Sequence, residues 1–179
     1  MSQQVLHRPH AAAEATGQAA AIRPLVIAAV AGMLAGMMMA MFSMVVAEID
    51  GYGFWAPPRA ITAVFFGAEN LGSGFEADAV IGGVAIHMVL SMMFGIGFAL
   101  MLAPRQKVNA VVQVMIGMAL GTVLWAVNTY VVAPVFEGNL FDEAMADWTW
   151  IAAHVIFGAA LAMIYAFWRP GRTSIEPRI

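Results

Sequence analysis

The sequence of 179 residues contains no cysteine, and only 11% of its residues are charged. Without cysteine the chain has no disulfide, no thiolate metal ligand and no cysteine nucleophile. It also lacks a GxSxG elbow and an HExxH helix, and no glycine-rich loop follows a predicted strand. No basic patch interleaved with aromatic residues indicates nucleic acid as a partner. These absences count against most enzyme classes and against a nucleic-acid-binding protein.

Hydrophobic residues dominate the chain and make up 62% of it. They form uncharged runs at about 25–47, 79–103, 111–132 and 148–168. With a rise of about 1.5 Å per residue, a helix of this length crosses the roughly 30 Å hydrocarbon core of a bilayer. We therefore expect an all-α integral membrane protein with four transmembrane helices.

The remaining sequence divides into short connections and two tails. Residues 23–169 hold all of the predicted spans, so we expect one four-helix membrane domain. Residues 1–22 are rich in alanine and show no apolar periodicity, which predicts a mobile cytoplasmic tail. Residues 170–179 are expected to form a cytoplasmic C-terminal tail.

The basic residues fall mainly on one side of the predicted spans. Those in the two tails and the second connection are Arg8, Arg23, Arg105, Lys107, Arg169, Arg172 and Arg178. Only Arg59 lies on the other side, together with most of the acidic residues. Because cytoplasmic loops carry an excess of Lys and Arg, both termini are expected in the cytoplasm. We expect the plasma (inner) membrane of a bacterium, with the lipid bilayer as the first partner.

Two pairs of predicted spans resemble each other. The first and third share a motif, GMLAG at Gly32–Gly36 and GMALG at Gly117–Gly121, and the second and fourth align so that His87 falls on His154. Small residues recur at every fourth position, a pattern that lets helices approach closely in lipid. We expect two parallel helical-hairpin repeats in a four-helix bundle. The same pattern would also serve a homo-oligomer or a larger membrane complex.

The first external loop is the longest connection. Pro57 and Pro58 are suited to the start of a helix, whose first positions need no backbone donor. Neighbouring aromatic residues are typical of the membrane–water interface. We expect a short interfacial helix over about Pro58–Ala68, with Arg59 meeting an external acid or a lipid phosphate.

The candidate functional site is a histidine pair. His87 and His154 lie inside predicted spans, where an unpaired ionisable group costs several kcal/mol, so they indicate a functional site. Counted from the outer helix ends at 1.5 Å per residue, they lie at depths of about 12 Å and 9 Å. Ser43 and Asn128 are expected as polar neighbours at a comparable depth, with Glu48 above them.

Several interpretations of this pair stay open. Each histidine can be structural and hydrogen-bond a facing polar group across a small-residue interface. Alternatively, His87 and His154 can ligate haem b or copper. The further candidate copper ligands are Met41, Met44 and Glu48. The pair can also relay protons or cations in a small transporter. A hydrolytic site among the acids of the outer loops is a further alternative.

Methionines on the first predicted span bear on the copper alternative. Met33, Met37 and Met41 follow one helical face, and their thioether sulfurs suit Cu(I). Met38 and Met39 are expected to point elsewhere, which favours the simpler interpretation that methionines fill gaps between helices.

These observations favour a non-enzymatic membrane component or accessory subunit with an outward-facing polar site around His87 and His154. A haem b or copper-binding electron-transfer subunit is the first alternative. A small ion or metal transporter is the second.

Overall fold

The computed structural model describes residues 8–103, 108–136 and 140–168, and every regular element in these ranges is a helix. The longer helices are α1 (Arg8–Ile49), α2 (Ala56–Phe66), α3 (Ala77–Leu102), α4 (Ala110–Val127) and α6 (Asp147–Trp168). The shorter elements are η1 (Ala68–Asn70), the π-helical turn η2 (Asn128–Val132), α5 (Ala133–Phe136) and η3 (Leu140–Glu143). The predicted all-α class is thus confirmed.

Four segments within the described residues are long and apolar enough to cross a membrane. They are Ile22–Ile49, Ala77–Leu102, Ala110–Val135 and Asp147–Trp168. Each overlaps one of the predicted spans, because long uncharged runs are the strongest signal in the sequence. The third segment is not one uniform helix, since it joins α4, η2 and part of α5.

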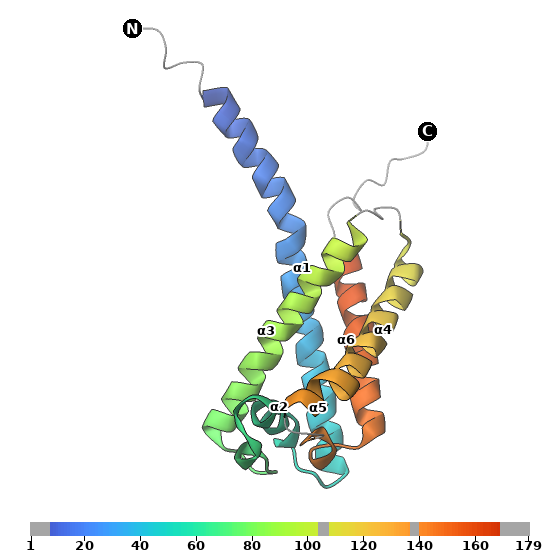
Figure 1. Cartoon of the computed structure of the whole chain (residues 1–179). Coiled ribbons are helices and arrows are strands. Elements are labelled where there is room, and N and C mark those ends of the chain that lie inside the picture. Colours follow the sequence, from blue (N-terminus) through green and yellow to red (C-terminus); the bar gives the residue numbers. More distant parts are fainter. Residues whose placement is uncertain (1–7, 104–107, 137–139, 169–179) are drawn as a thin grey trace.

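Helix α1 begins earlier than the sequence analysis expects. It starts at Arg8, inside the region predicted as a mobile tail, and extends past the ends of the other helices (Figure 1). Alanine has the highest helix propensity, and the stretch around residues 11–21 is rich in it. Helical propensity therefore prevails over the lack of apolar periodicity in residues 8–22.

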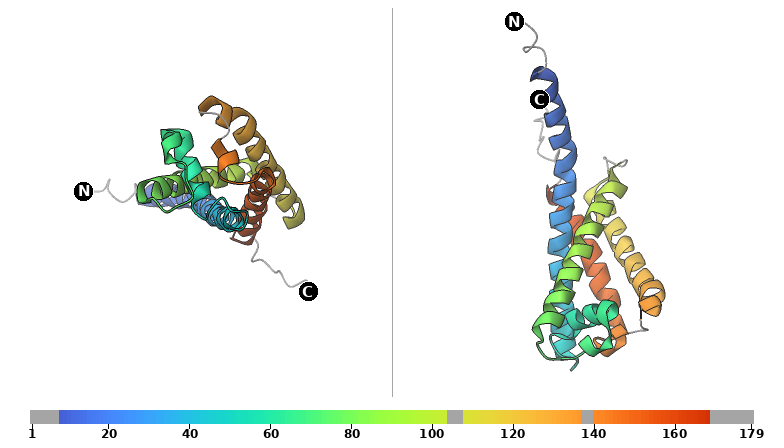
Figure 2. Two further views of the ribbon diagram at one scale, coloured as in Figure 1. Left: turned by 90° about the horizontal axis from the view of Figure 1, so that it is seen from below. Right: turned by 60° about the vertical axis from the view of Figure 1, so that its left-hand side comes forward.

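The four long apolar helices pack in the order α3, α1, α6, α4. Helix α1 packs extensively against both α3 and α6, and α6 packs against α4. Figure 2 shows α6 between α1 and α4, and α3 crossing α1 obliquely. Side chains of α3 and α6 also meet, since the ring centroids of Phe98 and Tyr165 lie 5.9 Å apart. Helix α3 therefore contacts α6 as well as α1.

Helices α1 and α3 cross closely at glycines. A Cβ built on Gly32 would collide with the backbone of Ser91 and Gly95. One built on Gly36 would collide with the side chain of Ser91. Only glycine permits this approach, because backbone atoms cannot move aside for an added methyl group.

Helices α4 and α6 cross in a similar way. A Cβ on Gly117 would collide with the backbone of Gly158 and the side chain of Ala162. One on Gly121 would collide with the backbone of His154. The second motif thus occupies the α4–α6 crossing as the first motif occupies the α1–α3 crossing.

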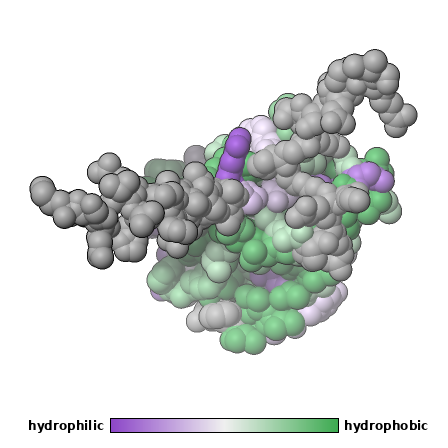
Figure 3. Space-filling view, turned by 90° about the horizontal axis from the view of Figure 1, so that it is seen from above, coloured by the Kyte–Doolittle hydropathy of each residue, from purple (hydrophilic) through white to green (hydrophobic). Residues whose placement is uncertain are grey.

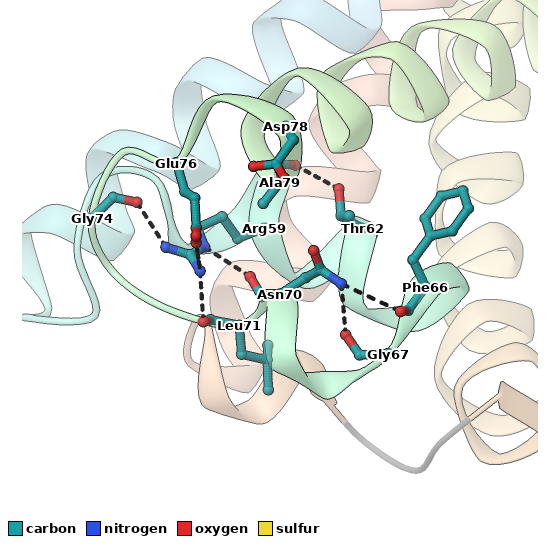
Figure 4. A network of polar contacts seen from close by, with 10 residues as sticks. All are labelled: Arg59, Thr62, Phe66, Gly67, Asn70, Leu71, Gly74, Glu76, Asp78 and Ala79. Carbon is teal, nitrogen blue, oxygen red and sulfur yellow. Dashed lines mark hydrogen bonds and ion pairs between the residues drawn. The ribbon is translucent and has the colours of Figure 1, made fainter.

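The end of the bundle that carries α2 is held by one buried arginine. Arg59, 8% exposed, donates to the backbone oxygens of Asn70, Leu71 and Gly74 at 2.7–3.2 Å. It also forms an ion pair of 2.5 Å with Glu76, which is the acid among the two predicted partners of Arg59 (Figure 4). Helix α2 begins at Ala56, two residues earlier than predicted, and Arg59 lies in its first turn. The arginine fixes the loop between α2 and α3 against α2.

The outside of the bundle is mostly apolar. Seen from the end opposite α2, hydrophobic residues dominate the visible surface outside the grey parts (Figure 3). The exposed large side chains include valines and methionines of α1, α3 and α4, such as Val111, Met115 and Met37. A surface of this kind is unfavourable in water and suits a lipid or protein environment.

Candidate functional site

Both predicted histidines line one cavity between the helices. This histidine cavity has a volume of about 80 Å³, and side chains from α1, α3, α4 and α6 surround it. Its lining comprises Met39, His87, Leu90, Ser91, Phe94, Leu124, His154 and Phe157. The lining contains no carboxylate. The structure thus brings together His87 on α3 and His154 on α6, which are 67 positions apart in the sequence.

Each histidine has one ring nitrogen bonded to a backbone carbonyl. His87 Nε2 lies 2.9 Å from the oxygen of Gly36, and His154 Nδ1 lies 2.8 Å from the oxygen of Trp150. A carbonyl oxygen only accepts, so in each contact the ring nitrogen carries the proton and donates it. In the neutral form, Nδ1 of His87 and Nε2 of His154 therefore keep a lone pair. Such a lone pair can accept a hydrogen bond or bind a metal ion.

Trp150 fixes the ring of His154 from the side of α2. The two rings meet edge to face, with centroids 4.8 Å apart. Trp150 is itself packed on Phe141, and the Trp150 side chain is only 7% exposed. Because both the ring contact and the hydrogen bond come from Trp150, the orientation of His154 is set within α6.

A second cavity lies next to the first on the side of α2. This outer cavity has a volume of about 50 Å³ and shares His87 and Met39 with the histidine cavity. Pro57, Pro58 and Ile61 of α2 line it, and the sulfur-bearing side chains around it are Met39, Met44, Met88 and Met145. The buried indole Nε1 of Trp150, another lining residue, has no hydrogen-bond partner among the described residues. Ser43, 3% exposed, adds one hydroxyl.

The remaining sequence candidates are distributed unequally. Ser43 and Met44 line the outer cavity together with His87. Met41 is 49% exposed and lines neither cavity. Glu48 is exposed and accepts a hydrogen bond from the backbone nitrogen of Phe54 at 2.7 Å. Asn128 begins the π-helical turn and lines neither cavity.

Met39 lines the histidine cavity, although no sequence pattern assigned it to the site. The glycine stripe of α1 has two flanks, and the structure buries the flank of Ala31, Ala35 and Met39 against α6. The flank that carries Met33, Met37 and Met41 is exposed. The signal was the pair of alanines, because small residues mark the side on which a second helix approaches. Met39 was expected to point elsewhere than Met33, Met37 and Met41, and it does; its place in the histidine cavity was not expected.

No group of three or more His, Asp or Glu residues is placed to hold a metal ion in the described part of the chain. A metal site at the histidine pair would accordingly need a third ligand of another type. The thioether of Met39 is the sulfur ligand that lines the same cavity as both histidines.

Fold and site together define a class: an all-helical protein with four helices long and apolar enough to cross a membrane, and a histidine pair between them. No model of a protein family, no curated protein and no solved structure matches the chain.

Proposed function

We propose that this chain is a non-enzymatic integral membrane protein, a membrane component or accessory subunit, with a ligand-binding site around His87 and His154. The observation that carries the proposal is the cavity that both histidines line between apolar helices. Each ring is held by a carbonyl and keeps one lone pair, as in a site organised in advance for an electron-pair acceptor. A purely structural histidine has no need of a shared cavity.

The four spans are proposed to cross the plasma (inner) membrane with both termini in the cytoplasm. The distribution of basic residues supports this orientation, since seven of the eight lie in the two terminal regions and the connection between α3 and α4. The end that carries α2 then faces outward, and the outer cavity lies between α2 and the histidine pair. Helix α2 is proposed to lie at the interface, since Tyr52 and Trp55 precede it.

The two helix pairs are proposed to be a parallel repeat. The contacts of Gly32 and Gly36 with α3 correspond to those of Gly117 and Gly121 with α6 under the alignment that places His87 on His154. Correspondence of motif, partner and crossing supports a common origin more strongly than the motif does alone. The apolar outer faces support a homo-oligomer or a larger complex, and the segment that contains α4 is the least buried of the four.

Cysteine labelling tests membrane insertion and orientation. Because the native chain has no cysteine, single substitutions give an unambiguous signal. We expect Ser73→Cys, in the loop after α2, to react with a membrane-impermeant maleimide in intact cells. Gln106→Cys, between α3 and α4, should react only after the membrane is opened. Reaction of Gln106→Cys in intact cells, or release of the protein by alkaline carbonate, would overturn the proposal.

An ion-flux measurement in liposomes distinguishes a binding component from a transporter. Purified protein reconstituted in vesicles is expected to carry no proton or alkali-cation flux above protein-free vesicles. A flux that His87→Gln and His154→Gln both abolish would replace the binding component with a transporter.

A further inference from the structure

We propose that the histidine cavity binds one monovalent copper ion, ligated by Met39 Sδ, His87 Nδ1 and His154 Nε2. This inference rests on the proposed function, because it names the ligand of the same site. It differs from the sequence-based copper site in its sulfur ligand, since Met41 faces outward and Met39 lines the cavity.

The donor atoms of the protein decide which ion the cavity binds. A donor with a lone pair binds electron-pair acceptors, and two imidazole nitrogens with one thioether sulfur form a soft set. Soft ligands favour Cu(I) over Mg²⁺, Ca²⁺ or Mn²⁺, which prefer carboxylate and carbonyl oxygen. The lining offers no carboxylate, so an oxygen-rich site for those ions is missing from this cavity.

Charge favours a monovalent over a divalent ion. The cost of transferring an ion into a medium of low dielectric constant rises with the square of its charge. All three proposed ligands are neutral, and the other side chains around the cavity are Leu, Phe and Ser. A divalent ion would keep its full charge there without a compensating anion, whereas Cu(I) carries a single charge.

The hydrogen bonds of the histidines provide the supporting shell. Metal-bound histidines almost always donate their second ring nitrogen to a carboxylate, a carbonyl or water, which fixes the ring and raises its basicity. His87 and His154 both make this bond to carbonyls, through opposite ring nitrogens. The protein therefore holds both rings before the ion arrives.

Haem fits this geometry less well than a single ion. Phe94 and Phe157, which line the cavity, are already in edge contact, with ring centroids 6.5 Å apart. A porphyrin between the histidines would have to separate α3 from α6. It would also need Nδ1 of His87 as the axial ligand, because Nε2 of that ring is bonded to Gly36.

The outer cavity provides a route to the site. Met44, Met88 and Met145 line it, and Met39 and His87 belong to both cavities. A soft ion can pass between thioethers without being fully stripped of ligands at any point. Met44 and Met145 are thus assigned to entry, and Met39 to the final site.

Copper binding by purified protein tests the site. The full-length chain, with His7→Ala and His10→Ala to remove the histidines of the N-terminal region and without a histidine tag, is titrated anaerobically with Cu(I) bicinchoninate. We expect one Cu(I) per chain. His87→Ala and His154→Ala should each abolish competition with the chelator, and Met39→Leu should weaken binding by about tenfold or more, as loss of a direct ligand costs at least as much as loss of an outer-shell partner.

Met41→Leu is the matched control, because it makes the same substitution two residues away on an exposed face of α1. It should leave the affinity unchanged. X-ray absorption at the copper edge should show one sulfur ligand in wild type and in Met41→Leu, and none in Met39→Leu. Absence of Cu(I) binding by folded wild-type protein, or equal affinity of Met39→Leu and wild type, overturns the assignment.

The entry route has a kinetic test. The double variant Met44→Leu, Met145→Leu should load copper several-fold more slowly with an unchanged equilibrium affinity, and loading at the wild-type rate overturns the route. Cysteine labelling reports insertion independently of copper. A correctly inserted protein that binds no Cu(I) thus refutes only the copper assignment, and a protein extracted by carbonate refutes the proposed function itself.

Discussion

The α1–α3 pair and the α4–α6 pair solve the same packing problem but hold their histidines differently. Both pairs cross at a glycine motif with backbone in contact. His87 donates across the crossing, from α3 to Gly36 of α1, whereas His154 donates within α6 to Trp150. The connections within the two pairs differ too: among the described residues, only the one between α1 and α3 contains a helix of more than two turns and a buried arginine. Two helix pairs with similar glycine crossings can thus hold their histidines through different hydrogen bonds.

The largest expected effect is at the α4–α6 crossing. In Gly158→Leu, the added side chain would meet the backbone of Gly117 and Gly121, which cannot move aside. Overpacking of this kind should cost about 3 kcal/mol or more. Unfolding in mixed micelles, followed by tryptophan fluorescence, measures the loss.

Gly97→Leu is the matched control for that substitution. Gly97 is exposed on α3, and an added Cβ there would meet nothing within 4 Å. It should unfold like wild type. Equal destabilisation by both substitutions would mean that α4 and α6 do not cross at Gly158.

The next largest loss of stability is expected in the connection between α1 and α3. Arg59→Met should destabilise the protein by about 2–3 kcal/mol, because three backbone carbonyls lose a charged donor. Glu76→Gln should cost only about 0–1 kcal/mol, because Glu76 is 57% exposed and such an ion pair is screened by water. Limited proteolysis of the α2–α3 loop should follow the same order. A larger loss in Glu76→Gln would show that the ion pair, rather than the carbonyl contacts, holds the loop.

A smaller loss of stability is expected when either histidine is replaced, measured in copper-free buffer. His87→Leu removes a bond between helices, and such bonds in membranes are worth about 0.6 kcal/mol on average and about 1.7 at most. His154→Leu removes a bond within one helix, so its effect on unfolding should be smaller than that of His87→Leu. If His154→Leu proves the more destabilising, the contact of His154 with Trp150 contributes more than the cross-helix bond.

The sequence was sufficient for the class of fold but insufficient for the site. Uncharged runs of more than twenty residues mark the long apolar helices whatever their partners, so all four overlapped the prediction. Which flank of α1 is buried depends on where α6 packs, and this tertiary fact separates Met39 from Met41. Arg59 was expected to meet an acid or a lipid phosphate, but its carbonyl partners depend on the path of the loop and leave no sequence signal.

The smallest expected loss of stability comes from removing the side-chain hydrogen bond between α4 and α6. Gln113 of α4, 2% exposed, donates to the backbone oxygen of Ala162 in α6 at 3.1 Å. Gln113→Leu should cost about 0.6 kcal/mol, the average for such bonds in membrane helices, in the same unfolding assay. Thr122→Val is the control, since Thr122 is exposed and its hydroxyl bonds only Met118 of its own helix. A loss in Gln113→Leu that matches His87→Leu would make the two pairs equivalent in their polar bonds. No loss at all would mean that α4 and α6 are held by their glycine crossing alone.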